Sequence, residues 1–172
     1  MGDYYDDPRC LSIPPIESPF GRFIISEKLR HNIITTKECN HLDELFNKGY
    51  TIVDSSLSSS TIDQAREDIA RGIKDKKVKE QEEGYRFNPK GSRVFEAWRW
   101  STAVRKIALD YRVLTLLELA YGRVPFPFQT INFDLGTEQG LHQDSIHFHS
   151  VPERYMSASW TALEDIQPDS GT

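Results

Sequence analysis

A histidine and an aspartate two residues apart, His142 and Asp144, are the side chains of this sequence best suited to hold a metal ion. In a β-strand, side chains at this spacing point to the same face, and their Cα atoms lie roughly 6.6 Å apart. An imidazole nitrogen and a carboxylate oxygen can then bind one metal ion at about 2.0–2.2 Å. The spacing therefore predicts a metal site on one face of a strand.

A second histidine would complete a ligand set with a defined chemistry. One carboxylate and two histidines form the facial triad of non-haem iron(II) oxygenases, which leaves three metal positions open. A 2-oxo acid can chelate the metal through two of these positions, and dioxygen can occupy the third. His147 and His149 follow the motif, but they could equally be substrate-side or surface groups. Because a His-x-Asp pattern occurs by chance in many sequences, the pattern alone favours an ordinary surface or core pair.

Alternating sequence around the motif predicts the strands that would position it. Residues 128–135 alternate in polarity, with Asn132 on the polar face. A second strand is expected to begin at Leu141, and a third is expected over about residues 155–166. A short strand is also expected at 50–53, between two helices. Several helices followed by consecutive strands suggest helices packed on a β-sandwich or barrel.

Amphipathic helices are expected before the strands. Thr35 and Glu38 form a capping box, and Gly49 stands where the helix that follows should end. The charged stretch 75–93 reads as solvated surface, although a segment near an active site that binds an anionic substrate is the alternative. Further helices are expected to start at Ser60, Ser101 and Asp110, and the last of them is expected to end at Gly122. On these helices the apolar residues at the spacing of a buried face are Cys39, Leu42, Leu45, Phe46, Ile62, Ala65, Ile69, Ile73, Ala103, Val104, Ile107, Ala108, Val113, Leu116, Leu117 and Ala120.

Residues 100–172 share the order and spacing of several motifs with one enzyme family. The motifs are a helix pair ending at Leu119-Ala120-Tyr121-Gly122, a strand at 128–133, Gly136-Thr137-x-Gln139, His142-Gln143-Asp144, a spacer at 152–156, and Trp160-Thr161-Ala162-Leu163-Glu164-Asp165-Ile166 before an x-Ser-Gly turn. In this pattern the sequence resembles the phytanoyl-CoA dioxygenase (PhyH) family of the Fe(II)/2-oxoglutarate-dependent oxygenase superfamily.

This resemblance implies an α+β fold, with N-terminal helices packed on a double-stranded β-helix (jelly-roll, cupin-like) core that is truncated after its first strands. Residues 1–172 are then expected to form a single, incomplete oxygenase domain. Its parts would be an irregular arm over 1–20, a mostly helical part over 21–122 and the first half of the jelly-roll over 123–172. By itself such a fragment is expected to be inactive.

The resemblance also implies the iron ligands. His142 and Asp144 match the first two ligands of the family, and the third ligand, a histidine, is expected beyond Thr172. The family's arginine, which pairs with the distal carboxylate of 2-oxoglutarate, is expected there too. The implied cofactors are Fe(II), 2-oxoglutarate as cosubstrate and dioxygen.

Three further residues match positions near the cosubstrate in the family. Gln143 lies in the middle of the motif, although strand alternation would aim its side chain away from the metal. Trp160 matches a tryptophan that lines the 2-oxoglutarate pocket, and a large core aromatic is the alternative interpretation. Asn132 matches a cosubstrate contact, and solvent exposure of a polar strand face is the alternative there.

The function that follows from the resemblance is hydroxylation of an unidentified small molecule. Asp144 favours hydroxylation over halogenation, because similar halogenases commonly replace this carboxylate with a small residue. One alternative is a catalytically silent jelly-roll binding domain of the same family. Another is a cupin-like metal enzyme that uses no 2-oxo acid and takes further ligands from the cluster between His142 and His149.

The charge and composition of the chain argue against several classes of binding partner. A net charge of -5 over 172 residues argues against nucleic acid as a ligand. The sequence has no apolar run long enough to span a bilayer, and its acidic first residues lack the pattern of a signal peptide. Cys10 and Cys39 offer neither a disulfide framework nor a metal-binding spacing. We therefore expect a cytoplasmic protein with a small-molecule substrate, without nucleic acid or membrane partners.

Overall fold

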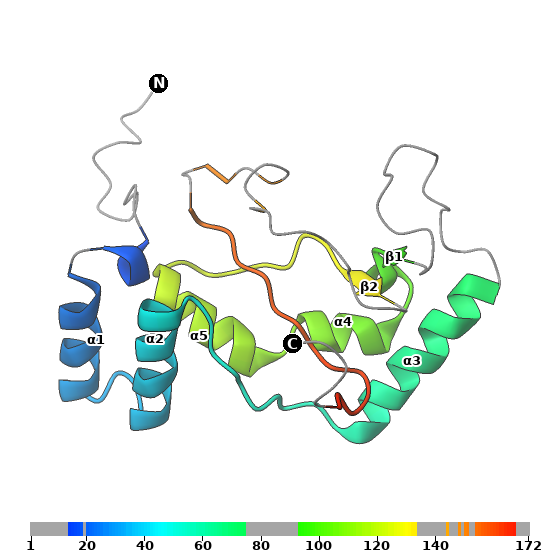
Figure 1. The fold of residues 1–172 in the computed structure, drawn as a ribbon, viewed down its shortest axis with the longest axis horizontal. Helices are drawn as coiled ribbons and strands as arrows, with labels where there is room; N and C mark the ends of the chain where they lie inside the picture. The colour runs from blue at the N-terminus through cyan, green and yellow to red at the C-terminus, as the bar shows by residue number, and fades with distance from the viewer. Residues whose placement is uncertain are drawn as a thin grey trace. The chain divides into compact units, whose positions relative to one another are not determined.

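The computed structural model describes residues 14–18, 20–74, 93–133, 144, 148, 150–151 and 154–167. Their elements, in chain order, are η1 (Pro15–Glu17), α1 (Gly21–Arg30), α2 (Thr36–Lys48), α3 (Ser59–Lys74), β1 (Arg93–Phe95), η2 (Ala97–Arg99), α4 (Thr102–Ala108), α5 (Tyr111–Tyr121) and β2 (Ile131–Phe133) (Figure 1). The chain divides into two compact units. The first comprises Met1–Ser55, Tyr111–Phe126 and Asp144–Ala158, and the second comprises Ser56–Asp110, Pro127–Gln143 and Ser159–Thr172.

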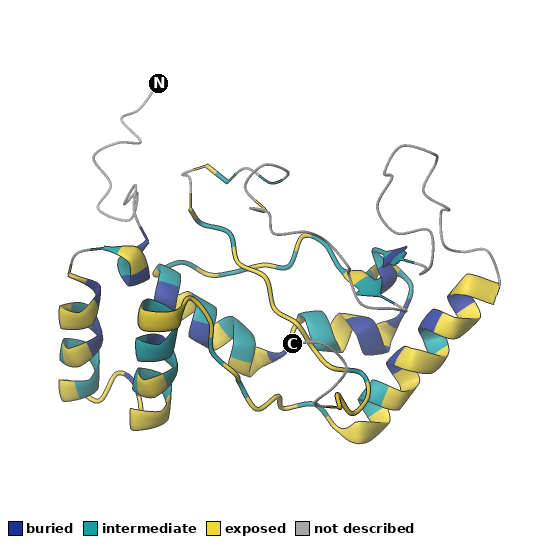
Figure 2. Ribbon diagram, viewed as in Figure 1, coloured by how far each residue is buried: buried dark blue, intermediate teal, exposed yellow. Residues whose placement is uncertain are grey.

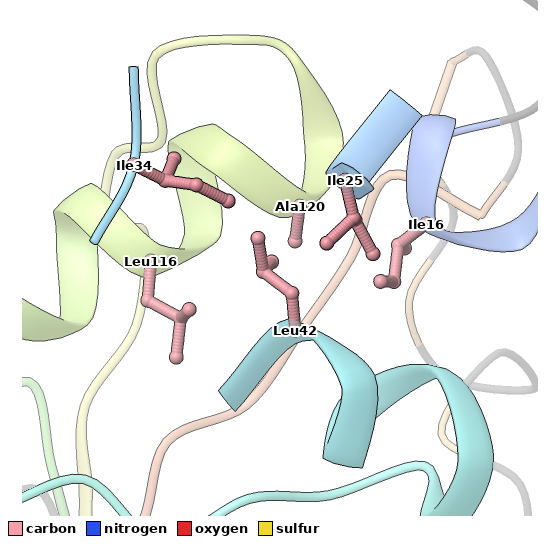
Figure 3. Packing of buried hydrophobic residues seen from close by; sticks show 6 residues of the cluster. All are labelled: Ile16, Ile25, Ile34, Leu42, Leu116 and Ala120. Atoms are coloured by element: carbon pink, nitrogen blue, oxygen red, sulfur yellow. The ribbon is translucent and has the colours of Figure 1, made fainter. Parts of the chain in front are cut away.

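The first unit is built from η1, α1, α2 and α5 around an apolar core (Figure 3). Leu42 of α2 is fully buried and points toward Ala120 of α5. Cys39, Leu45 and Phe46 pack against the same core, as their spacing predicts. The six buried residues of this core are Ile16, Ile25, Ile34, Leu42, Leu116 and Ala120.

Local sequence signals fix both ends of α2. The Thr35 hydroxyl accepts a hydrogen bond from the Glu38 amide at 3.2 Å, and the Glu38 carboxylate accepts one from the Thr35 amide at 2.7 Å. Gly49 follows the last turn with φ of 80°, a left-handed conformation that costs glycine little. The capping box and the glycine stop are therefore confirmed.

The second unit packs α3, η2 and α4 around Val94 of β1. Figure 2 shows α3 with an exposed surface that buried positions interrupt along one side. Ala65 and Ile69 are buried as predicted, whereas Ile73 is 40% exposed, so its predicted place in the core is wrong. Gly72 takes that position, because an added Cβ there would lie 2.4 Å from the Trp100 ring. The indole packs directly on the helix backbone.

The sheet contains two antiparallel strands, β1 and β2. Arg93 pairs with Phe133, and Val94 pairs with Asn132. Opposite residues of an antiparallel pair share a face, and neighbours along a strand alternate. Arg93 and Phe133 therefore lie on one face of the sheet, and Val94 and Asn132 on the other, which is the core side.

Among the described residues, helices and this small sheet make up a mixed α+β structure, and the predicted strands are only partly present. Of the strand predicted over 128–135, residues Ile131–Phe133 are confirmed as β2, residues 128–130 form no strand, and residues 134–135 lie outside the described residues. Residues 50–53 and 155–166 form no strand, so these two predictions are wrong. At 50–53 the chain is held by side chains, because the Thr51 hydroxyl bonds both His41 and Glu44.

A partly buried hydrogen bond joins α3 to the start of α4. Ser101, only 1% exposed, accepts a hydrogen bond from the Val104 amide at 3.1 Å, which confirms it as the predicted cap. Its hydroxyl donates to the Asp68 carboxylate at 2.7 Å. This bond lowers the pKa of Asp68 against the opposing effect of burial, and Gln64 lowers that pKa further.

We expect Asp68→Ala to lower the free energy of unfolding by roughly 1.5–3 kcal/mol at neutral pH, because the Ser101 hydroxyl would lose a charged partner. The folded-state pKa of Asp68 is lowered, so its contribution is present above the unfolded pKa of about 3.9. That contribution disappears as pH falls through the folded-state value. Urea unfolding of both proteins at neutral pH and near pH 3 measures this, and an equal difference at both pH values would contradict it.

Candidate functional site

The structure describes three of the residues predicted for the site, Asn132, Asp144 and Trp160. His142 and Gln143 lie outside the described residues. Within the described ranges, which leave out His142, no three metal-ligating side chains gather. The metal assignment therefore depends on the sequence motif and on the surroundings of the described site residues.

Asp144 lies on the surface of the first unit, where a metal ion can reach it. Its backbone carbonyl accepts a hydrogen bond from the Phe148 amide at 2.9 Å. Asp144 itself is not in a strand, and the other residues at the start of the strand predicted from Leu141 lie outside the described residues. Imidazole and carboxylate are both suitable donors for iron(II), and the chemistry of the predicted His142 and Asp144 pair fits that ion.

Trp160 stacks on the ring of Phe133 in the second unit. The ring centroids lie 5.7 Å apart, and the rings are within 5° of parallel. Trp160 is nevertheless 77% exposed, so it is not the core aromatic of the alternative interpretation. An indole held flat on a strand residue and open to solvent can form one wall of a ligand pocket.

Arg93 completes this group, and sequence reasoning missed it. Its guanidinium carbon lies 5.3 Å from the centroid of the Phe133 ring. The Nη2 atom is buried, and it has no hydrogen-bond partner among the residues that the structure describes. A buried guanidinium nitrogen without a partner is costly, and it is suited to a carboxylate ligand. The alternation of Arg93-Val94-Phe95 was the available signal, but it stands at the end of a charged stretch.

Asn132 is not brought together with Trp160. Trp160 contacts Phe133, whereas Asn132 pairs with Val94 and lies on the opposite, core-facing side of the sheet. Asn132 is half-buried there. The aromatic face of the sheet therefore carries Arg93, Phe133 and Trp160 without Asn132.

Comparison with known proteins identifies one family. The family model for phytanoyl-CoA dioxygenase (PhyH) matches residues 46–172 of this 172-residue chain, well over half of it. No curated protein and no solved structure matches the chain. In the part of the chain that the structure describes, no helix is long and apolar enough to cross a membrane.

Proposed function

The chain belongs to the phytanoyl-CoA dioxygenase family, and from this premise we propose that it supplies the first two iron ligands of an iron(II)- and 2-oxoglutarate-dependent dioxygenase, without being active by itself. The observation that carries the proposal is the His142-x-Asp144 motif, which has metal-ligand spacing and lies inside the matched residues 46–172. The proposed reaction is hydroxylation of a small molecule in the cytoplasm. We propose β1 and β2 as the beginning of the family's jelly-roll sheet.

His142 and Asp144 would hold iron(II), through an imidazole nitrogen and a carboxylate oxygen. When bound with 2-oxoglutarate and dioxygen, the metal supplies the oxidation of a substrate C–H bond. Both ligands must be deprotonated to bind, so acid should weaken the site. The exposure of Asp144 supports this role, because its carboxylate can be reached without unfolding the chain.

The aromatic face of the sheet belongs to the second unit, and by itself it supports a second part of the proposal, a surface that contacts the cosubstrate. Trp160 and Phe133 would provide an apolar wall for the carbon chain of 2-oxoglutarate. Besides the arginine expected beyond Thr172, Arg93 would offer a second guanidinium to a carboxylate of this cosubstrate, since a guanidinium presents two parallel donors. Gln143 remains a proposed contact beside the metal. Asn132 remains a proposed cosubstrate contact only at the edge of the sheet, because its side chain lies on the face opposite Trp160.

Chelation of a 2-oxo acid to iron(II) produces a visible charge-transfer band, which tests the proposed function directly. We expect the band to appear when 2-oxoglutarate is added to the chain with iron(II) under anaerobic conditions. Succinate is the matched control, because it lacks the 2-oxo group and should give no band. A spectrum that stays unchanged at high concentrations of iron and 2-oxoglutarate would contradict the proposal.

We expect Arg93→Ala to weaken 2-oxoglutarate binding roughly tenfold or more, because a charge-assisted hydrogen bond is worth about 1.5–3 kcal/mol. Arg93→Lys should recover part of the affinity. Arg99→Ala is the control, since Arg99 also lies over an aromatic ring, that of Trp98, but stands outside the β1–β2 sheet. Titration of the charge-transfer band measures all three variants, and equal affinities for the Arg93→Ala and Arg99→Ala variants would remove Arg93 from the site.

A further inference from the structure

A series of short contacts connects Asp144 to the end of α5 within the first unit. The Phe148 amide donates to the Asp144 carbonyl at 2.9 Å, and the Tyr155 amide donates to the Ser150 hydroxyl at 3.0 Å. Each bond ties together two points of the chain. Phe148 and Ser150 are two residues apart, so at most about 7 Å of chain separates the two bonded pairs.

The far end of this series is fixed by aromatic and cationic side chains. The Tyr155 ring lies 6.1 Å from the Tyr121 ring, at an angle of 52°. The Arg123 guanidinium lies 4.4 Å from the centroid of the Tyr155 ring, close enough for a cation–π contact. Tyr155 is thus held from the C-terminal end of α5 and from the residues just after it.

Two further contacts hold the same segment. The Tyr121 hydroxyl donates to the Met156 carbonyl at 3.2 Å, and burial raises the pKa of Tyr121, which keeps this donor protonated. Arg154 has a left-handed φ of 70° and forms an ion pair with Glu17 at 3.3 Å. A strained backbone conformation persists only where the surroundings hold it. Residues 154–156 are therefore attached to α5 and to η1.

We infer that Arg123 and Tyr155 are positioning residues for the Asp144 carboxylate. They contact neither a metal nor a substrate, and they act through the printed hydrogen bonds of Tyr155 to Ser150 and of Phe148 to Asp144. A ligand at an exposed position needs such support, because a metal site tolerates little error in ligand placement. This inference rests on the proposed function for its consequence, iron binding, but the mechanical link between Tyr155 and Asp144 can be measured independently.

The test compares Tyr155→Leu and Tyr155→Phe with the wild-type chain. Leucine removes the ring that Arg123 and Tyr121 contact, whereas phenylalanine keeps it. Arg123→Met removes the cation, and Arg22→Met is its control, because Arg22 makes a similar contact with Phe46 at 4.8 Å in a different part of the first unit. Three quantities are measured: amide hydrogen exchange at Phe148, iron(II) affinity and the thermal midpoint.

We expect Tyr155→Leu and Arg123→Met to speed exchange at Phe148 roughly tenfold, because the Phe148 to Asp144 bond would open more often. Iron(II) affinity should fall about tenfold in the same variants. Tyr155→Phe and Arg22→Met should resemble the wild type in both quantities. Unchanged exchange at Phe148 in Tyr155→Leu would overturn the inference, whether or not the chain binds iron.

The two proposals fail in different ways. A wild-type chain without iron affinity contradicts the proposed function, while exchange at Phe148 still decides the link to Tyr155. If the wild-type chain and the Tyr155→Leu variant bind iron equally tightly, Tyr155 has no positioning role. The positioning role is also overturned if Tyr155→Leu lowers the thermal midpoint but changes neither amide exchange at Phe148 nor iron(II) affinity. Tyr155 would then only stabilise the fold.

Discussion

Asp144→Ala should lose iron(II) binding, because it removes one of two assigned ligands and leaves a single imidazole to hold the ion. The loss should be at least about tenfold in affinity, the lower end of the effect seen even for residues that only support a ligand. Since Asp144 is exposed, the thermal midpoint should remain close to the wild-type value. Anaerobic calorimetric titration with iron(II) measures the affinity.

The controls for this prediction separate ligand loss from loss of charge. His142→Ala should match Asp144→Ala in effect. Asp165→Ala removes another exposed carboxylate downstream and should bind iron as the wild type does. Equal affinities for the Asp144→Ala variant, the Asp165→Ala variant and the wild type would remove Asp144 from the ligand set.

Leu42→Ala should cause the largest loss of stability, about 2–5 kcal/mol in the free energy of unfolding. Leu42 is completely buried in the core of the first unit, where it points toward Ala120 from the facing helix (Figure 3). Truncation therefore removes buried apolar surface and leaves a cavity between helices. Denaturant unfolding measures the loss.

Leu109→Ala is the matched control for this substitution, since Leu109 is 48% exposed at the end of α4. Its cost should be below about 1 kcal/mol, as for most surface positions. Similar costs for the two leucine variants would mean that the first unit does not depend on the core built around Leu42.

The helices could be predicted because their signals are local. The capping box at Thr35, the stop at Gly49 and the cap at Ser101 each involve residues within four positions of one another. Helix α1 (Gly21–Arg30) was not predicted individually, and in α3 tertiary packing changed one detail, because Gly72 faces Trp100 and Ile73 turns outward. No spacing rule distinguishes these two neighbours, because the choice depends on an indole from another part of the chain.

The strands could not be predicted as reliably, because a strand exists only when a partner pairs with it. Residues 155–166 have a suitable composition, yet the Met156 carbonyl is bonded by the Tyr121 hydroxyl and no ladder forms. Residues Arg93–Phe95 form β1 because β2 lies beside them. The charged sequence before β1 gave no sign that Val94 would pair with Asn132, 38 positions later in the chain.

The same limit applies to the candidate site. The spacing of His142 and Asp144 is a local signal, and the sequence motif identifies it without a fold. Arg93 could be recognised only after the register placed it opposite Phe133, and hence near Trp160. The register also placed Asn132 beside Val94, on the face that does not carry the aromatic pair. The β1–β2 pairing therefore determines which polar residue of the sheet lies on the face of the aromatic pair.

X-ray absorption of the iron(II)-loaded chain tests the central claim most directly, because it reports which atoms surround the metal. We predict a shell of nitrogen and oxygen ligands that includes imidazole scattering from His142 and a carboxylate oxygen from Asp144. The imidazole contribution should disappear in His142→Ala. A spectrum with sulfur ligands, or one that is the same in the wild type and in His142→Ala, would contradict the assignment of this motif as the iron site.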